Sequence, residues 1–168
     1  MLSIKLALDL TGERKIDPIE TFKRKFHMVK LIIADDHHMV REAWALLLSR
    51  DPRVDIVATC ENGERAIAIC KELQPDVVLM DINMEPVNGI DATRAIRQFS
   101  SQIKIIGISV HTDLPYLNAL MQAGANGYVT KNSPCEEMIK AIMLVADGEK
   151  YFCREIVEIQ RNGESERF

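Results

Sequence analysis

Three aspartates come directly after, or end, short apolar segments of the sequence. Asp35 and Asp36 follow "VKLIIA" (29–34), and Asp81 ends "VVLMD" (77–81). Apolar runs of this length, without polar alternation, predict strands that are buried on both faces, as in a parallel sheet. Because the carboxyl ends of parallel strands meet at one edge of a sheet, we expect the three carboxylates to share one crevice if the two strands are neighbours.

Carboxylates that share a crevice repel each other and raise one another's pKa. A divalent cation relieves this repulsion, and a site made of oxygen ligands and water suits Mg²⁺. Mg²⁺ is therefore the expected cofactor. The four cysteines include no CxxC pair, so a zinc site is not expected. We interpret them as the buried, reduced thiols of a cytoplasmic protein.

Two further polar residues end the later strand-like segments. Ser109 ends "IKIIGIS" (103–109), and Lys131 ends "NGYVTK" (126–131). Taken singly, an aspartate, serine or lysine at such a position is usually a turn, cap or solvated residue. Together with a metal-bound carboxylate, however, a hydroxyl and an ammonium can hold a phosphoryl group, and a carboxylate can form an aspartyl phosphate. The convergence of all five residues favours a phosphoryl site.

Strand-like and helical segments alternate along the chain. Strands are expected at 29–35, 54–60, 75–81, 103–109 and 126–131, and helices at 39–50, 63–73, 89–99, 114–124 and after "SPCE" (133–136). This alternation predicts an α/β fold of five parallel strands with five helices on both faces, an open three-layer sandwich. Asn62 is a candidate N-cap, and Ser133 with Glu136 predicts a capping box for the last helix.

The totals describe an ordinary globular protein. The chain has 168 residues and a formal net charge of -4, with 47% hydrophobic residues, which favours one domain with appendages. The slight acidity gives no basic patch for nucleic acid, and no 18-residue apolar run predicts a membrane helix. Residues 1–28 are expected to be an N-terminal extension, mobile or left from an upstream start or from cloning. Residues 29–150 form the predicted domain, and 151–168 a tail with a short helix and no DNA-binding domain.

Four motifs in this order resemble those of the response-regulator receiver domains of two-component signalling. They are "IIADDHHMVREAW", "VVLMDINMEPVNGIDATR", "IGISVHTD" and "GYVTK". The resemblance covers about residues 29–150. The last two motifs, with "SPCEEMIKAI", are most similar to the NarL/LuxR-type branch, whose members usually carry a C-terminal helix-turn-helix. The resemblance implies the CheY-like, flavodoxin-like fold with strand order 2-1-3-4-5.

The resemblance also implies roles for the acidic residues. Asp81 corresponds to the phosphoacceptor, and Asp36 to the direct Mg²⁺ ligand. Asp35 corresponds to the acid that acts through water, and the backbone carbonyl of Asn83 to the third protein ligand. A phosphohistidine on a sensor histidine kinase would be the phosphoryl donor.

The same resemblance assigns the residues around the phosphoryl group. Ser109 corresponds to the hydroxyl that bonds the phosphoryl group, and Lys131 to the family's lysine. Tyr128 corresponds to the switch aromatic, which is expected to turn from solvent into the space that Ser109 vacates. His111 and Val110 are interpreted as residues that steer or exclude water and so modulate hydrolysis.

Two positions depart from the family pattern. Glu85 stands where the family usually has proline, with Pro86 one residue later, which adds an acid near the site. Asn132 follows Lys131 where many receivers have proline, and a cis peptide there would cost about 2.5–4 kcal/mol.

Other functions remain open at this stage. A phosphohydrolase of the haloacid-dehalogenase type also uses an aspartyl nucleophile, but it needs an acid two residues later, where this chain has Asn83. A DNA-binding regulator needs about 60 further residues for a helix-turn-helix, so no nucleic acid contact is expected from this chain, which is a stand-alone receiver or part of a longer regulator. A homodimer through the last two helices is a further hypothesis. His37 and His38 are interpreted as capping or partner-contact residues.

Overall fold

The computed structural model describes residues 28–110 and 112–165. In chain order the elements are β1 (Val29–Ala34), α2 (His38–Leu48), β2 (Val54–Cys60), α3 (Gly63–Leu73), β3 (Val77–Asp81), α4 (Gly89–Phe99), β4 (Lys104–Ser109), α5 (Leu114–Gln122), β5 (Gly127–Thr130), α6 (Cys135–Ala146), β6 (Tyr151–Phe152) and α7 (Arg154–Ser165). Of the sequence predictions, the extension at 1–28, save Met28, and the role of His111 lie outside the described residues.

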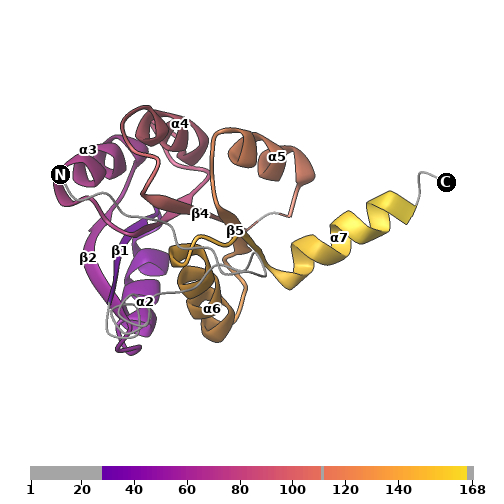
Figure 1. Cartoon of the computed structure of the whole chain (residues 1–168), viewed down its shortest axis with the longest axis horizontal. Coiled ribbons are helices and arrows are strands. Elements are labelled where there is room, and N and C mark those ends of the chain that lie inside the picture. The colour runs from indigo at the N-terminus through magenta and orange to yellow at the C-terminus, as the bar shows by residue number, and fades with distance from the viewer. Residues whose placement is uncertain (1–27, 111, 166–168) are drawn as a thin grey trace, which may run out of the picture.

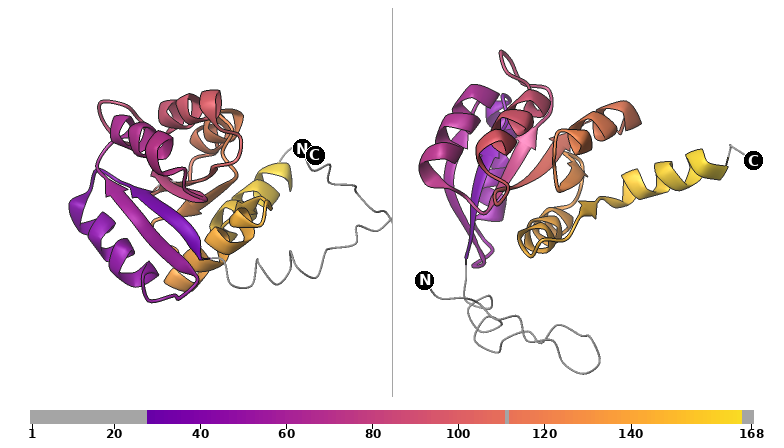
Figure 2. Two further views of the ribbon diagram at one scale, coloured as in Figure 1. Left: turned by 60° about the vertical axis from the view of Figure 1, so that its left-hand side comes forward. Right: turned by 45° about the horizontal axis from the view of Figure 1, so that its top comes forward.

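The strands form one parallel sheet in the order β2-β1-β3-β4-β5-β6 within the described ranges. Helices α3, α4 and α5 cover one face and α2 and α6 cover the other, so the sheet is the middle of three layers (Figures 1 and 2). The predicted order 2-1-3-4-5 is confirmed. Strand β6 is additional and extends the sheet beyond β5. Helix α7 lies in the tail for which a short helix was expected, and it projects away from the sheet (Figure 1).

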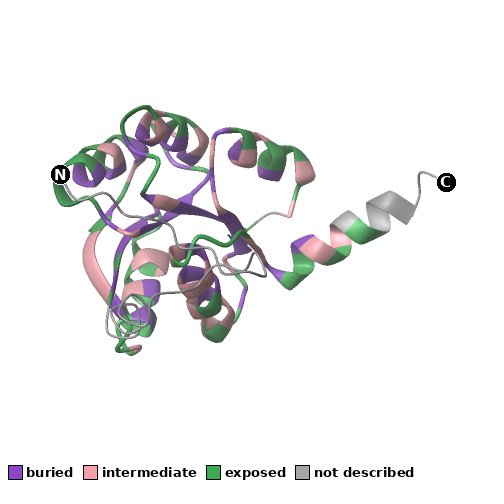
Figure 3. Cartoon of the chain, in the orientation of Figure 1, coloured by how far each residue is buried: buried purple, intermediate pink, exposed green. Residues whose placement is uncertain are grey.

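The central strands make the core. Every residue of β3 is buried, and Lys30 is the exposed exception in β1. Figure 3 shows the buried colour along the central strands of the sheet. Neighbouring side chains of a strand point to opposite faces, yet Ile32 and Ile33 are both fully buried. The unbroken apolar runs therefore belong to strands covered on both faces, as predicted. No helix in the described ranges combines the length and the apolar character that a membrane crossing requires.

Of the two predicted helix caps, the one at the start of α3 is present and the one at the start of α6 is not. The Asn62 side chain accepts a hydrogen bond from the Arg65 backbone N–H at 2.9 Å, so the predicted cap of α3 is confirmed. The predicted capping box of the last helix is wrong. Helix α6 begins at Cys135 with no side-chain cap bond, because the Ser133 hydroxyl instead lies 3.1 Å from the Thr130 hydroxyl.

Arg97 fastens the end of α4 to the start of β4 and to the segment before β5. Its guanidinium donates to the carbonyls of Gly124 at 2.8 Å, Ile103 at 2.7 Å and Ser100 at 3.1 Å. It also donates to the Asn126 side-chain oxygen at 2.9 Å. These bonds hold β4 and β5, which carry Ser109 and Tyr128, in place.

Arg97→Ala is expected to lower the free energy of unfolding by about 3 kcal/mol, because it leaves partly buried carbonyls without a donor. Arg94→Ala is the matched control, because Arg94 lies one turn earlier on α4, is exposed, and pairs with the exposed Asp91. Its loss should cost about 0.5 kcal/mol or less. Urea unfolding of both variants checks this, and equal effects would contradict a fastening role for Arg97.

Candidate functional site: an acidic pocket at the carboxyl edge of the sheet

Asp35 and Asp81 lie side by side at the carboxyl edge of the sheet. Strands β1 and β3 pair in parallel with Ala34 opposite Met80, and each aspartate is the next residue along its strand. Both carboxylates are buried, whereas the Asp36 side chain is 35% exposed. The neighbouring strands thus bring the predicted carboxylates into one pocket that opens to solvent on the Asp36 side.

Lys131 lies between the two buried carboxylates. Its Nζ is 2.7 Å from Asp81 Oδ2 and 2.8 Å from Asp35 Oδ2, and its side chain is only 7% exposed. Burial lowers the pKa of this ammonium, but the bonds to Asp35 and Asp81 outweigh burial, so the pKa of Lys131 is raised. It therefore stays positively charged, and three carboxylates against one ammonium leave two negative charges in the pocket.

The pKa of Asp81 reflects its burial first and the neighbouring charges second. Burial raises the pKa of its carboxyl, Lys131 opposes this, and the nearby Asp35 charge adds to the rise, so that the pKa of Asp81 is above its ordinary value. The Asn83 backbone N–H donates to Asp81 Oδ1 at 3.2 Å. The carboxylate is thereby held in one orientation, at an energetic cost that a further cation would reduce.

The donor set fits a hard divalent cation. Ligand atoms from Asp35, Asp36, His37 and Asp81 all lie within 4.8 Å of one another. Asp35 Oδ2 is fully buried, and although Lys131 Nζ lies 2.8 Å away, it accepts no hydrogen bond of good geometry among the described residues. A buried carboxylate oxygen in this state is a suitable oxygen ligand for Mg²⁺.

His37 belongs to this pocket, although the sequence was interpreted differently. It precedes α2 but makes no side-chain cap bond, so the capping interpretation is wrong. Its backbone N–H donates to Asp35 Oδ1 at 2.8 Å, and its ring Nδ1 lies 2.7 Å from Asp36 Oδ1. The sequence signal that could have shown this is the position of the histidine directly after two acids at a strand end.

Ser109 and Tyr128 lie on the neighbouring strands β4 and β5. Both are buried, and the Tyr128 side chain hydrogen-bonds that of Ser109. Burial raises the pKa of the Tyr128 phenol. The structure has this ring inside the domain, the position that the sequence hypothesis expected after phosphorylation, while either position was allowed before it.

Comparison with known proteins shows the family to which this fold belongs. Residues 31–143 match the family model "Response regulator receiver domain". The chain is a member of this family. The curated relatives of the receiver domain are longer than the matched region.

The relatives confirm the similarity to the NarL/LuxR-type branch. The receiver domain is 37% identical over 123 residues to the transcriptional regulatory protein DegU of Brevibacillus brevis, covering 73% of this chain and 52% of DegU. It is 37% identical over 131 residues to the response regulator GacA of Pseudomonas aeruginosa, covering 78% and 61%. The chain thus spans about half to three fifths of the length of these curated relatives.

Solved structures show the same similarity to the NarL/LuxR-type branch. A LuxR-family two-component response regulator from Aurantimonas sp. SI85-9A1 superposes with a TM-score of 0.75 at 32% identity, over 78% of this chain and 94% of that one. The signal receiver domain of the putative response regulator NarL from Mycobacterium tuberculosis gives 0.71 at 29% identity, over 73% and 99%.

The remaining predicted residues of the receiver lie around the pocket's loops. Asn83 and Glu85 are exposed in the loop between β3 and α4, and Val110 is 55% exposed directly after Ser109. The cis peptide bond of the described residues is Glu85–Pro86, and the Lys131–Asn132 bond is not cis. Glu85 is not among the side chains that gather as metal ligands.

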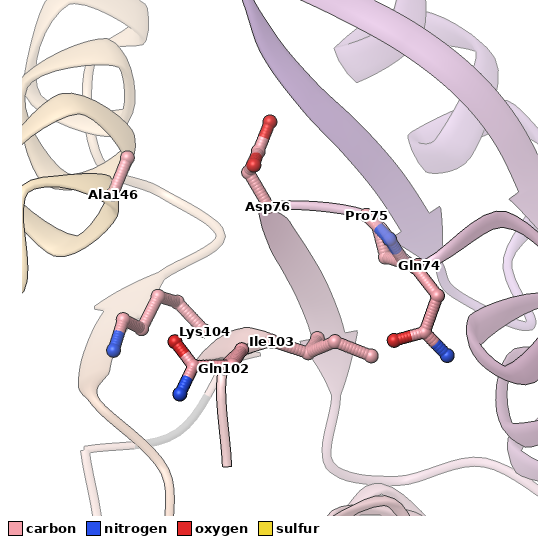
Figure 4. Close-up of a pocket in the computed structure, with 7 residues that line it drawn as sticks. All are labelled: Gln74, Pro75, Asp76, Gln102, Ile103, Lys104 and Ala146. Atoms are coloured by element: carbon pink, nitrogen blue, oxygen red, sulfur yellow. The ribbon is translucent and has the colours of Figure 1, made fainter. Parts of the chain in front are cut away.

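A second hollow of the receiver lies at the opposite edge of the sheet. This pocket of about 300 Å³ is found where β3 and β4 begin (Figure 4). Its lining residues are Gln74, Pro75, Asp76, Gln102, Ile103, Lys104 and Ala146. None of the predicted site residues is among them, so the carboxyl edge remains the site that the chemistry favours.

Proposed function

We propose that this chain is a cytoplasmic receiver that accepts a phosphoryl group on Asp81 from a phosphohistidine of a sensor histidine kinase. The observation that supports this most is the buried Asp81 carboxylate, held 2.7 Å from Lys131 Nζ beside a second buried acid. In the transfer, an Asp81 oxygen forms the bond to phosphorus while the phosphorus–nitrogen bond to the donor imidazole breaks. The electron pair of that bond leaves with the imidazole.

The other pocket residues have separate tasks in this proposal. Lys131 neutralises one phosphoryl oxygen, and the Ser109 hydroxyl bonds another. Asp36 and Asp81, with the Asn83 carbonyl and with Asp35 through water, would hold Mg²⁺, which supplies positive charge for the phosphoryl oxygens. A phosphohydrolase of the haloacid-dehalogenase type needs an acid two residues after the nucleophile, and this chain has Asn83 there, which disfavours the phosphohydrolase alternative.

The output is a change of the surface formed by α5, β5 and α6. The Tyr128 ring is already buried against Ser109. We propose that phosphorylation draws Ser109 toward the phosphoryl group and increases the population of molecules with the Tyr128 ring inside. A partner then recognises the changed surface. Val110, Glu85 and His111 would modulate how long the phosphoryl group persists.

The partners follow from the same proposal. The match to about half of DegU, whose name is that of a transcriptional regulatory protein, supports a role in a longer LuxR-type regulator. DNA contact would then belong to residues that are not in this chain, and a homodimer through α5 and α6 would be controlled by Asp81.

With acetyl phosphate and Mg²⁺, the full chain is expected to take up about one phosphoryl group per molecule, because one nucleophile is present. Chelation of Mg²⁺ should abolish uptake. Intact-mass spectrometry measures the stoichiometry, and a generic phosphomonoester assay provides the contrast. Steady turnover of the phosphomonoester, with no labelled protein, would contradict the receiver proposal and favour the phosphohydrolase.

A further inference from the structure

Four side chains of the described ranges offer possible metal-ligand atoms at the pocket, and His37 is the one that offers a nitrogen. The other three are the carboxylates of Asp35, Asp36 and Asp81. The His37 ring Nδ1 lies 2.7 Å from Asp36 Oδ1 and 3.5 Å from Asp35 Oδ1. The backbone N–H of the same residue bonds Asp35 Oδ1, so the base of the side chain is anchored at the pocket. The imidazole is therefore a feature of the pocket rather than of the loop surface alone.

These ligand atoms lie close to one another, within 4.8 Å for the whole group. Metal bonds of about 2.1 Å place neighbouring ligand atoms about 3 Å apart and opposite ones about 4.2 Å apart in an octahedral site. The 3.5 Å distance from His37 Nδ1 to Asp35 Oδ1 lies between these values, whereas the 2.7 Å distance to Asp36 Oδ1 is that of a hydrogen bond, so the side chains must shift to take an ion. The His37 ring is 66% exposed, so an ion can reach it from solvent.

The same distances also allow a simpler role. If Nδ1 carries the ring proton, His37 donates a hydrogen bond to Asp36 and only orients it. In the other neutral tautomer the proton is on Nε2, and the Nδ1 lone pair is available to a metal. The two roles differ in which metal the pocket prefers, because imidazole suits borderline transition metals while Mg²⁺ takes oxygen ligands.

We propose that His37 is a metal ligand of this pocket and lets the receiver bind a borderline divalent ion, such as Co²⁺ or Zn²⁺, more tightly than Mg²⁺. The inference rests on the proposed function, since it uses the same carboxylates. It adds a regulatory consequence, because the identity of the bound ion then decides how well the pocket accepts a phosphoryl group.

The test compares Co²⁺ and Mg²⁺ binding to the full chain, prepared without a polyhistidine tag, by titration calorimetry. His37→Ala should weaken Co²⁺ binding about ten- to hundredfold, but Mg²⁺ binding about twofold at most. His38→Ala is the matched control, because the neighbouring histidine faces Glu42 at 3.9 Å and not the pocket acids. It should change neither affinity.

A spectroscopic measurement identifies the ligand directly. Electron spin echo spectra of bound Mn²⁺ should show nitrogen modulation in the wild type, in His38→Ala and in His111→Ala, and none in His37→Ala. Equal weakening of Co²⁺ and Mg²⁺ in His37→Ala, or nitrogen modulation that persists in that variant, would overturn the inference.

The receiver role and the metal inference are tested by different measurements. Phosphoryl uptake by the wild type with Mg²⁺ tests the receiver role without His37, so it can succeed while the metal inference fails. If Asp36→Asn leaves the binding of both ions unchanged, the pocket is not a metal site, and the proposed Mg²⁺ role and the His37 inference fall together.

Discussion

Asp81→Asn is expected to take up no phosphoryl group from acetyl phosphate and Mg²⁺, while its folded state becomes more stable than that of the wild type without Mg²⁺. The uptake is lost because an amide is not a nucleophile in this chemistry. The stability rises because a carboxylate whose burial raises its pKa is replaced by a neutral group of the same shape. Lys131 keeps Asp35 as its partner at 2.8 Å, so no charge is left alone.

The gain in stability should depend on pH with a definite sign. The folded-state pKa of Asp81 is above the ordinary value of 3.8. The wild type therefore loses stability as the pH rises from that value through the raised pKa, and Asp81→Asn has no such loss. The difference between them should be absent at the acid end and reach about 1 kcal/mol at neutral pH.

Urea unfolding in chelator across this pH range measures the difference, and Glu72→Gln controls for the loss of an exposed carboxylate on α3. The control should be near neutral at every pH. An Asp81→Asn domain that is less stable than the wild type at neutral pH would show that the buried ion pair with Lys131 outweighs the burial of the charge.

Lys131→Ala is expected to cost about 3–5 kcal/mol of stability and to reduce phosphoryl uptake strongly. Removal of one partner from a buried charge group leaves the other charges uncompensated, and here both Asp35 and Asp81 lose their cation. The phosphoryl oxygens also lose a charge partner. Lys150→Ala, at an exposed lysine, is the control. Unfolding and intact-mass measurements on both variants check the prediction.

A double variant identifies the cause. If Lys131→Ala destabilises through the repulsion between Asp35 and Asp81, then adding Asp81→Asn should recover more stability than the same substitution adds to the wild type. Mg²⁺ should also recover more in Lys131→Ala than in the wild type, because the ion replaces the missing charge. Strictly additive effects of the two substitutions would show that the loss comes from packing and not from charge.

The sequence determined the architecture because strands that are buried on both faces appear in it as apolar runs. Strand β3, and strand β1 apart from Lys30, are apolar runs. Their carboxyl ends place Asp35 and Asp81 at one edge in any parallel sheet of this order. The position of Lys131 and Ser109 at the ends of later strands followed from the same rule. The pattern of apolar residues predicts where the strands end, because it depends on which faces of each strand are buried.

The tertiary structure decided what depends on the conformation of individual side chains and on short pairings. Strand β6 has two residues, too few to show periodicity, and it exists because the edge of β5 is there to pair with. Ser133 was free by sequence to cap α6, but the Thr130 hydroxyl lies close enough to compete for it.

The same holds inside the pocket. Neither the inward position of the Tyr128 ring nor the contact of His37 with Asp36 follows from residue type or spacing, because each depends on a rotamer chosen by neighbours from other strands and loops. The sequence therefore fixes which charges meet at the edge of this sheet. Only the packed structure determines which nitrogen and which ring lie beside them.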